Sequence, residues 1–278
     1  GKGALVIKMT KKWKEYLNIE DKDTKETKET DSYLNNKGYE LCKELAEIKI
    51  PQQKIDEKRK LIYNEIVKEV GEEITGNNYK KLFKDKEMKL MFDLYDKNFF
   101  NHKLSDLAKE SECQWIICWN NRCTKSAGLQ RCKIDGTCKI IQIELASKVF
   151  EEVIQKMESN DLDFIKMDDK NKCNSILTCL QLTFEHELIH GLQTCFCLDW
   201  KTDQKGPGIW KGRTGPRTGH SKTFMSILNN TFGHVDYQHS LFSGGHKEKS
   251  PKEEKPKKEK PKKEKPKKEK PKKEKPKK

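Results

Sequence analysis

The sequence predicts an α+β protein, because helical patterns occupy both ends of its apolar part and strand-like patterns lie between them. Apolar residues recur at helical spacing over 38–72 and again over 82–99. Three short apolar runs bounded by polar clusters follow, and helical spacing returns from about residue 145. Since strands and helices are segregated along the chain and do not alternate, we expect helices packed on a small antiparallel sheet.

Residues 1–80 form a predicted charged, helical N-terminal extension. Leu41, Leu45 and Ile48 share one helix face, and a second apolar stripe runs from Ile55 to Val70. These stripes predict amphipathic helices near 38–48 and 52–72. The extension is either an accessory module or part of the packed core, and its amphipathic faces favour packing on the core.

The predicted main domain covers residues 81–245. It opens on a helix whose apolar stripe consists of Leu82, Met88, Met91, Phe92, Tyr95 and Phe99. The expected strands lie at Gln114–Trp119, Ser126–Cys132 and Lys139–Leu145. Further helices are expected at 145–158 and 173–197, and a shorter one is expected after His220.

Residues 246–278 are a charged, proline-rich tail. They hold 18 Lys against 7 Glu, which is +11 of the formal net charge of +14. The unit PKKEK repeats from Pro251 onward, so the tail has no apolar residue to bury and its prolines break any helix. We expect an extended, disordered tail that serves either as an electrostatic arm for phosphate backbones or as a solubilising segment.

The ten cysteines belong to a chain much longer than a small secreted disulfide scaffold. The first ten residues hold an apolar run of only four, too short for a signal peptide, and no stretch approaches the ~20 apolar residues of a membrane span. We therefore expect a soluble intracellular protein with reduced thiols. One group of four cysteines lacks the CxxC pairs of a structural zinc motif, which favours buried strand thiols over a second metal site. It consists of Cys118, Cys123, Cys132 and Cys138.

The motif HELIH at His186–His190 carries the strongest chemical signal in the sequence. On a helix, His186 and His190 lie four positions apart on one face, with Glu187 beside them. Two imidazoles can then hold one zinc ion while the carboxylate takes a proton from a water that the ion activates. Apolar neighbours predict a buried helix, and Gly191 is expected to let another backbone approach closely.

A third metal ligand can be sought by elimination. A metzincin-type extension of the motif needs Gly at 193 and His at 196, but the chain has Gln193 and Phe196, and no Glu occurs from 188 to 246. We favour His220, because it directly precedes a helix start capped by Ser221. The alternatives are His234, His239, His246, Asp199, Asp203 and Asp236. His234, His239 and Tyr237 are also candidates either for a hydrogen bond to a reacting oxyanion or for plain packing.

Several segments together resemble the SprT-like, or Spartan-type, metalloprotease domain over about 83–243. They are LMFDLYDKNFFNHKL, the strand ending CWNN, SAG at Ser126–Gly128, CKIIQIEL, FEHELIH and GHSKTF. The resemblance implies a zincin-like core in which His186, His190 and His220 bind one zinc ion and Glu187 is the catalytic base. It also implies DNA-stimulated proteolysis of DNA-bound proteins, including covalent DNA-protein crosslinks. We accordingly expect a monomer without membrane association in the nucleus or another DNA-containing compartment.

The segment from Trp200 to Lys222 is basic and contains two tryptophans. Its candidate nucleic-acid contacts are Trp200, Lys201, Trp210, Lys211, Arg213 and Arg217. Cations follow phosphates while an indole face stacks on an unpaired base, so single-stranded or frayed DNA is the expected partner. The alternative is a flexible, solvated loop whose tryptophans pack on the core.

Three functions remain open at this point. The favoured one is a zinc-dependent endopeptidase that acts on DNA-associated proteins in DNA-protein crosslink repair. The second is a non-catalytic DNA-binding adaptor with a structural zinc site. The third is a metalloprotease that acts independently of DNA.

Overall fold

The computed structural model describes residues 37–135, 138–197, 220–237 and 244–245. Two compact units are distinguished, residues 1–246 and 247–278, and every described element belongs to the first. The predicted tail therefore lies outside the described residues. In chain order the elements are a helix over 37–47, α3 (Gln52–Val70), α4 (Tyr79–Leu82), α5 (Asp85–Phe100), α6 (Lys103–Glu110), β1 (Cys113–Asn120), β2 (Gly128–Asp135), β3 (Cys138–Ala146), α7 (Ser147–Ser159), β4 (Phe164–Lys166), β5 (Lys172–Cys173), α8 (Ile176–Phe196), α9 (Lys222–Phe232) and β6 (Gly244–Gly245).

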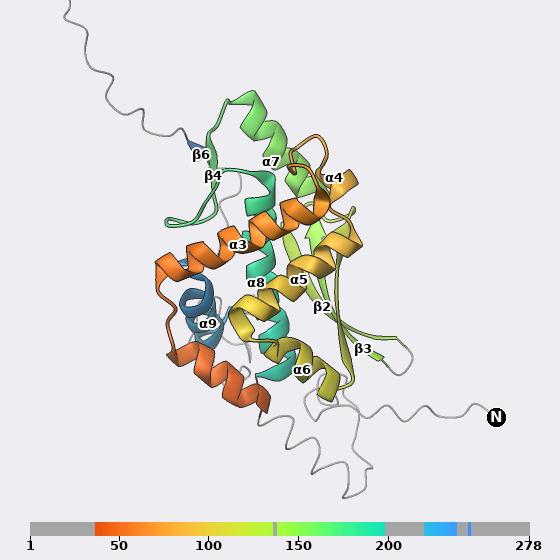
Figure 1. The fold of residues 1–278 in the computed structure, drawn as a ribbon, viewed down its shortest axis with the longest axis vertical. Helices are drawn as coiled ribbons and strands as arrows, with labels where there is room; N and C mark the ends of the chain where they lie inside the picture. The colour runs from red at the N-terminus through yellow and green to blue at the C-terminus, as the bar shows by residue number, and fades with distance from the viewer. Residues whose placement is uncertain (1–36, 136–137, 198–219, 238–243, 246–278) are drawn as a thin grey trace, which may run out of the picture. The chain divides into compact units, whose positions relative to one another are not determined.

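Both predicted N-terminal helices are confirmed, and both pack into the same hydrophobic core as the rest of the described chain. Leu41 is buried in the first of them, and Ile55, Ile62 and Ile66 are completely buried on α3. Helix α3 contacts α5, α8 and α9, and Figure 1 shows it lying across the middle of the molecule. Of the two interpretations of this region, packing on the core is the one that holds for residues 37–70.

The predicted helix of the Leu82 to Phe99 stripe is interrupted, so that Leu82 ends α4 and the other apolar positions belong to α5. The interruption has a local cause, because the Glu87 carboxylate accepts a hydrogen bond from the Lys84 amide and so caps the start of α5. The three later helices are confirmed as α7, α8 and α9. Helices α8 and α9 both start at serine caps, since Ser175 accepts from the Thr178 amide and Ser221 from the Phe224 amide.

The main sheet has the strand order β1-β3-β2, and it is mixed, not antiparallel as predicted. Strand β3 pairs antiparallel with β2 but parallel with β1. The predicted strand direction was wrong for β1. Apolar alternation indicates which face of a strand is buried, whereas the neighbour of a strand and its direction depend on long-range contacts. Strand β3 takes the central place, and its inward side chains Ile141, Ile143 and Leu145 are completely buried.

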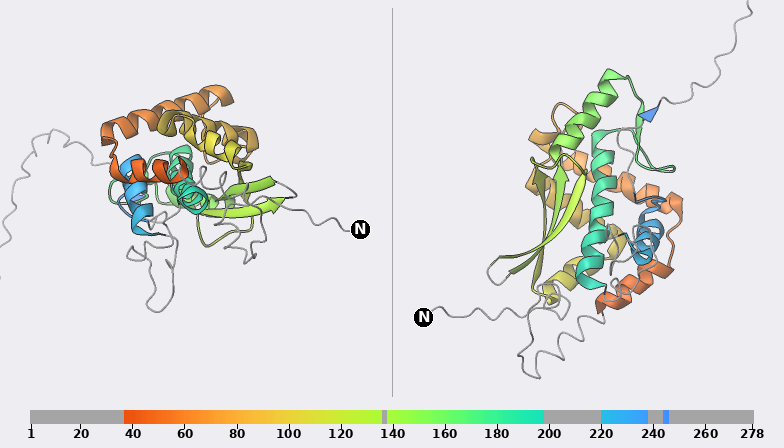
Figure 2. Two further views of the ribbon diagram at one scale, coloured as in Figure 1. Left: turned by 90° about the horizontal axis from the view of Figure 1, so that it is seen from below. Right: turned by 180° about the vertical axis from the view of Figure 1, so that it is seen from behind.

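Helix α8 lies between this sheet on one side and α9 on the other (Figure 2). A methyl group at Gly191 of α8 would meet the Trp115 ring at 2.7 Å, so the glycine makes room for an indole. The sequence predicted a close backbone at this position, and the neighbour is instead a side chain from β1. The bare helix surface at Gly191 thus sets how closely α8 approaches the sheet.

A second, smaller sheet has the order β5-β4-β6, and β4 pairs antiparallel with both neighbours. Strand β4 contacts α7, and β4 and β5 precede α8 in the chain, whereas β6 follows α9. Among the described helices, none combines the length and the apolar character needed to cross a membrane.

Cys42 and Cys197 form a disulfide that joins the 37–47 helix to the residue following α8. The expectation that all thiols are reduced is therefore wrong for this pair, and the cysteines no longer support a reducing compartment. The two residues are 155 positions apart, which no local spacing reveals. Cys118 and Cys123 belong to no metal-ligating cluster within the described residues, and the side chains of Cys132 and Cys138 lie outside them.

Replacing Ile62 by Ala tests whether α3 belongs to the core. Ile62 is completely buried, so the truncation should lower the free energy of unfolding by about 2–5 kcal/mol, measured by urea denaturation. The matched control is Leu61→Ala at the adjacent, 47% exposed side chain, which should change it by about 0.5 kcal/mol or less. Equal effects of the two substitutions would contradict the packing of α3.

Candidate metal centre

Helix α8 presents the two histidines of the HELIH motif from a buried surface. His186 is 5% exposed and His190 is half-buried, and their Nε2 atoms lie 3.1 Å apart. This close approach follows from the helix, because residues four apart lie one above the other on the same face. The predicted relation between the two side chains is confirmed.

His220 reaches the same point from the start of α9. Its Nε2 atom lies 3.0 Å from that of His186 and 3.0 Å from that of His190. The neighbouring Ser221 caps α9 and accepts a hydrogen bond from Gln193 of α8, so the backbone beside His220 is held against α8. Of the candidate third ligands within the described residues, His220 is therefore the one that the structure brings to the HELIH pair.

The three imidazoles fit a zinc ion in both spacing and protonation. Ligand atoms about 2.0–2.1 Å from a tetrahedral zinc lie about 3.3–3.4 Å from one another, slightly farther apart than the three Nε2 atoms. Burial lowers the pKa of His220 to about 4, against the opposing influence of Asp236. Its imidazole is then neutral at physiological pH, which is the form that coordinates a metal. The cluster can hold a metal ion.

Phe224, on the first turn of α9, packs against all three imidazoles. The ring centroids are 5.1 Å from His186, 4.3 Å from His190 and 4.9 Å from His220. The phenyl ring is completely buried. It therefore forms an apolar wall that restricts the orientations of the three ligands.

Glu187, on α8, is 7% exposed, and its side chain lies against the start of strand β2. Burial, with a smaller influence from Cys123, raises the pKa of Glu187 to about 8. A methyl group added at Gly128 of β2 would lie 2.5 Å from the Glu187 Cγ and 2.8 Å from Oε1. The glycine thus leaves the space that the carboxylate occupies, and a buried carboxyl with a raised pKa is suited to accept a proton.

The other residues predicted as metal ligands, oxyanion donors or nucleic-acid contacts lie in different surroundings. His234 is completely buried and its Nε2 lies 2.7 Å from the Glu185 Oε2, so it is neither a ligand of the cluster nor placed to meet a substrate. Tyr237 packs on the His220 ring at a centroid distance of 4.6 Å, and the charge of Asp236 raises the pKa of His220 against the effect of burial. Two sets lie outside the described residues: the alternative ligands Asp199, Asp203, His239 and His246, and the candidate nucleic-acid contacts Trp200, Lys201, Trp210, Lys211, Arg213 and Arg217.

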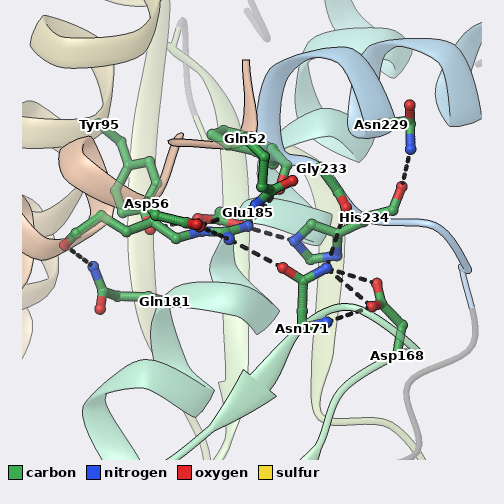
Figure 3. A network of polar contacts seen from close by, with 12 residues as sticks. Gln52, Asp56, Tyr95, Asp168, Asn171, Gln181, Glu185, Asn229, Gly233 and His234 are labelled. Atoms are coloured by element: carbon green, nitrogen blue, oxygen red, sulfur yellow. Dashed lines mark hydrogen bonds and ion pairs between the residues drawn. The ribbon is translucent and has the colours of Figure 1, made fainter. Parts of the chain in front are cut away.

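Sequence reasoning did not assign a role to Glu185, which precedes the first ligand. Its carboxylate is the centre of a buried polar cluster that Figure 3 shows, with Tyr95 and His234 pointing toward it. A signal was present, because an acidic residue stands in the otherwise uncharged stretch LQLTFE of a helix predicted to be buried. Phe224 and Gly128 were noticed only as parts of the family resemblance.

Compared with known protein families, with curated proteins and with solved structures, the chain matches none. The assignment of the cluster as a metal centre therefore depends on its own geometry and chemistry. The resemblance to the SprT-like domain stays a prediction.

Removal of the third histidine should impair metal binding. His220→Ala should weaken zinc affinity by about 100-fold or more, because loss of a direct ligand exceeds the 10–100-fold effects typical of outer partners. Competition with a chromophoric chelator measures the affinity. His102→Asn is the control, since His102 is an exposed histidine in the left-handed region that Asn tolerates. Unchanged affinity in His220→Ala would mean that another group completes the site.

Proposed function

We propose that this protein is a zinc-dependent endopeptidase of the SprT-like type that acts on DNA-associated proteins. The observation that carries the proposal is the convergence of three imidazole Nε2 atoms, at mutual distances of 3.0–3.1 Å, beside a buried carboxyl group. Three protein ligands and a neighbouring base are the usual composition of a hydrolytic zinc site, in which a fourth position is left for water or substrate.

Each protein group has a distinct task in this reaction. His186, His190 and His220 hold the ion. Zinc at this position would polarise a peptide carbonyl and lower the pKa of a water molecule toward ~7. Glu187 takes the proton of the attacking water on its carboxylate and passes it to the amine nitrogen that leaves. Burial makes this carboxyl a stronger base. A bound metal ion would favour its ionised form.

A structural zinc site explains the geometry less well. Structural sites are normally closed by four protein ligands, whereas the cluster contains three in the described part of the chain. A structural site also requires no carboxyl group at Glu187. Burial of this carboxyl is unfavourable, and no ionic partner is among the causes of its raised pKa. These two observations favour the hydrolase over the adaptor.

The choice of DNA-associated substrates has its support in the sequence. The resemblance to the SprT-like domain implies it, and the basic, tryptophan-containing segment before His220 is suited to single-stranded DNA. Because that segment leads directly to the third ligand, DNA binding there can favour an ordered metal centre. The DNA-independent metalloprotease differs in one respect, since its cleavage rate would not change with DNA or salt.

Glu187→Gln tests the proposed function. The amide cannot accept the proton, so cleavage of a labelled DNA-binding protein in the presence of single-stranded DNA should slow by about 100-fold or more. Zinc content should equal that of the wild type. Glu152→Gln, an exposed change of the same kind on α7, should leave the rate unchanged. Wild-type zinc protein that cleaves nothing, or Glu187→Gln with full activity, would reject the endopeptidase. Omitting DNA in the same assay decides whether DNA stimulates cleavage.

Gly128→Ala tests the placement of the base. The new methyl group would lie 2.5 Å from the Glu187 Cγ, so the carboxylate has to move. We expect kcat to fall by about 10-fold or more, because displacements of about 1 Å at a reacting group have large effects on rate. Zinc content should not change. Gly76→Ala is the control, since its methyl group would meet the side chain of Ile154 on α7 and no residue of the candidate site. Loss of zinc in Gly128→Ala would instead indicate a general distortion.

A further inference from the structure

Glu185 occupies the centre of a buried cluster that reaches from α3 to the residues after α9 (Figure 3). Its side chain is completely buried, and the Tyr95 hydroxyl donates to Oε1 at 2.7 Å. The Arg59 guanidinium donates from Nε to Oε1 at 2.7 Å and from Nη2 to Oε2 at 2.6 Å. His234 Nε2 is 2.7 Å from Oε2. The carboxylate therefore binds three side chains at once.

The charge state of Glu185 follows from these partners. The Arg59 guanidinium makes two charge-assisted hydrogen bonds to this carboxyl group, and such a pair favours the ionised form. The carboxylate is ionised and can only accept hydrogen bonds, so His234 is the donor from Nε2. Adjacent residues on a helix point about 100° apart, which directs Glu185 toward α3 while His186 faces the other ligands. Glu185 thus takes no direct part in holding a metal.

The same cluster fastens the C-terminal end of α9. Arg59 Nη2 donates to the Phe232 carbonyl oxygen at 2.5 Å, and Asn171 Nδ2 donates to that of Gly233 at 3.2 Å. The last carbonyl groups of a helix have no partner within the helix, and cations are favoured there. Together with the bond from His234 to Glu185, these contacts tie the end of α9 to α8 and α3.

The N-terminal end of α9 is fastened to α8 as well, through the hydrogen bond from Gln193 to Ser221. Glu185 and Gln193 are eight residues apart on α8, or about 12 Å. Both zinc ligands of α8, His186 and His190, lie between these two attachment points. Helix α9, and with it the third ligand, is therefore fastened at both ends by contacts that bracket the HELIH motif.

We propose that Glu185 is a positioning residue of the metal centre, which uses Arg59 and His234 to hold α9 where His220 meets the other two histidines. The inference rests on the zinc site of the proposed function and assigns that site a supporting charge cluster. A buried ion pair contributes little net stability compared with apolar side chains of similar size, but it permits only one arrangement of its partners. Four directed hydrogen bonds to one carboxylate are a means of fixing geometry more than of adding stability.

Glu185→Gln keeps the shape of the side chain and removes its charge. Zinc affinity, measured by competition with a chelator, should fall by about tenfold or more, since outer partners of metal ligands have effects of this size. The visible absorption of the cobalt-substituted protein should change as the ligand geometry changes. Ile66→Ala is the matched control, because it truncates a completely buried side chain of α3 outside the cluster. It should lower stability while leaving zinc affinity and the cobalt spectrum as in the wild type.

The double variant Arg59→Met with Glu185→Leu separates positioning from stability, and it also serves if Glu185→Gln fails to fold. Apolar replacement of a buried ion pair often restores stability, so the double variant should unfold at a urea concentration near that of the wild type. Its zinc affinity should still be about tenfold weaker or more. Wild-type affinity in a folded Glu185 variant would overturn the positioning role alone. Absence of zinc binding in the wild type would instead overturn the metal centre itself.

Discussion

Helix α8 is buried on almost every side, so burial of the polar side chains that it carries is unfavourable unless they find partners inside the protein. Gln181 donates to the backbone of α3, Glu185 binds charged groups from α3 and the end of α9, and Gln193 binds the start of α9. Between these groups, His186 and His190 face His220. The requirement for polar partners thus determines which elements surround α8 and in what order they meet it.

Local signals explain why much of the site was predictable. The spacing of HELIH places two histidines on one helix face, and Ser221 marks the start of the next helix directly after His220. Helix positions and the three strand segments follow from periodicity in the same way. The direction of β1 relative to β3 does not follow from periodicity, because alternation identifies the buried face of a strand but does not indicate which strand pairs with it or in which direction.

Contacts between residues far apart in the chain account for what could not be predicted. Arg59 and Glu185 are 126 residues apart, and the disulfide partners Cys42 and Cys197 are 155 apart. Nothing in the neighbourhood of Arg59 distinguishes it from the other basic residues of α3. Only the unusual place of Glu185, in an apolar part of a helix, indicates from sequence that a buried cation has to exist somewhere else.

Two carboxyl groups, Glu185 and Glu187, are two residues apart on one buried helix and acquire opposite properties. Burial acts on both, but Arg59 and His234 bring the pKa of Glu185 to about 2, whereas no cation within the described residues offsets the burial of Glu187, and its pKa rises to about 8. The first carboxyl is permanently ionised and suited to hold other elements in place. The second is a base whose proton affinity lies near neutral pH, which suits proton transfer. Because successive helix positions point in different directions, one helix can direct the first group toward α3 and the second toward strand β2.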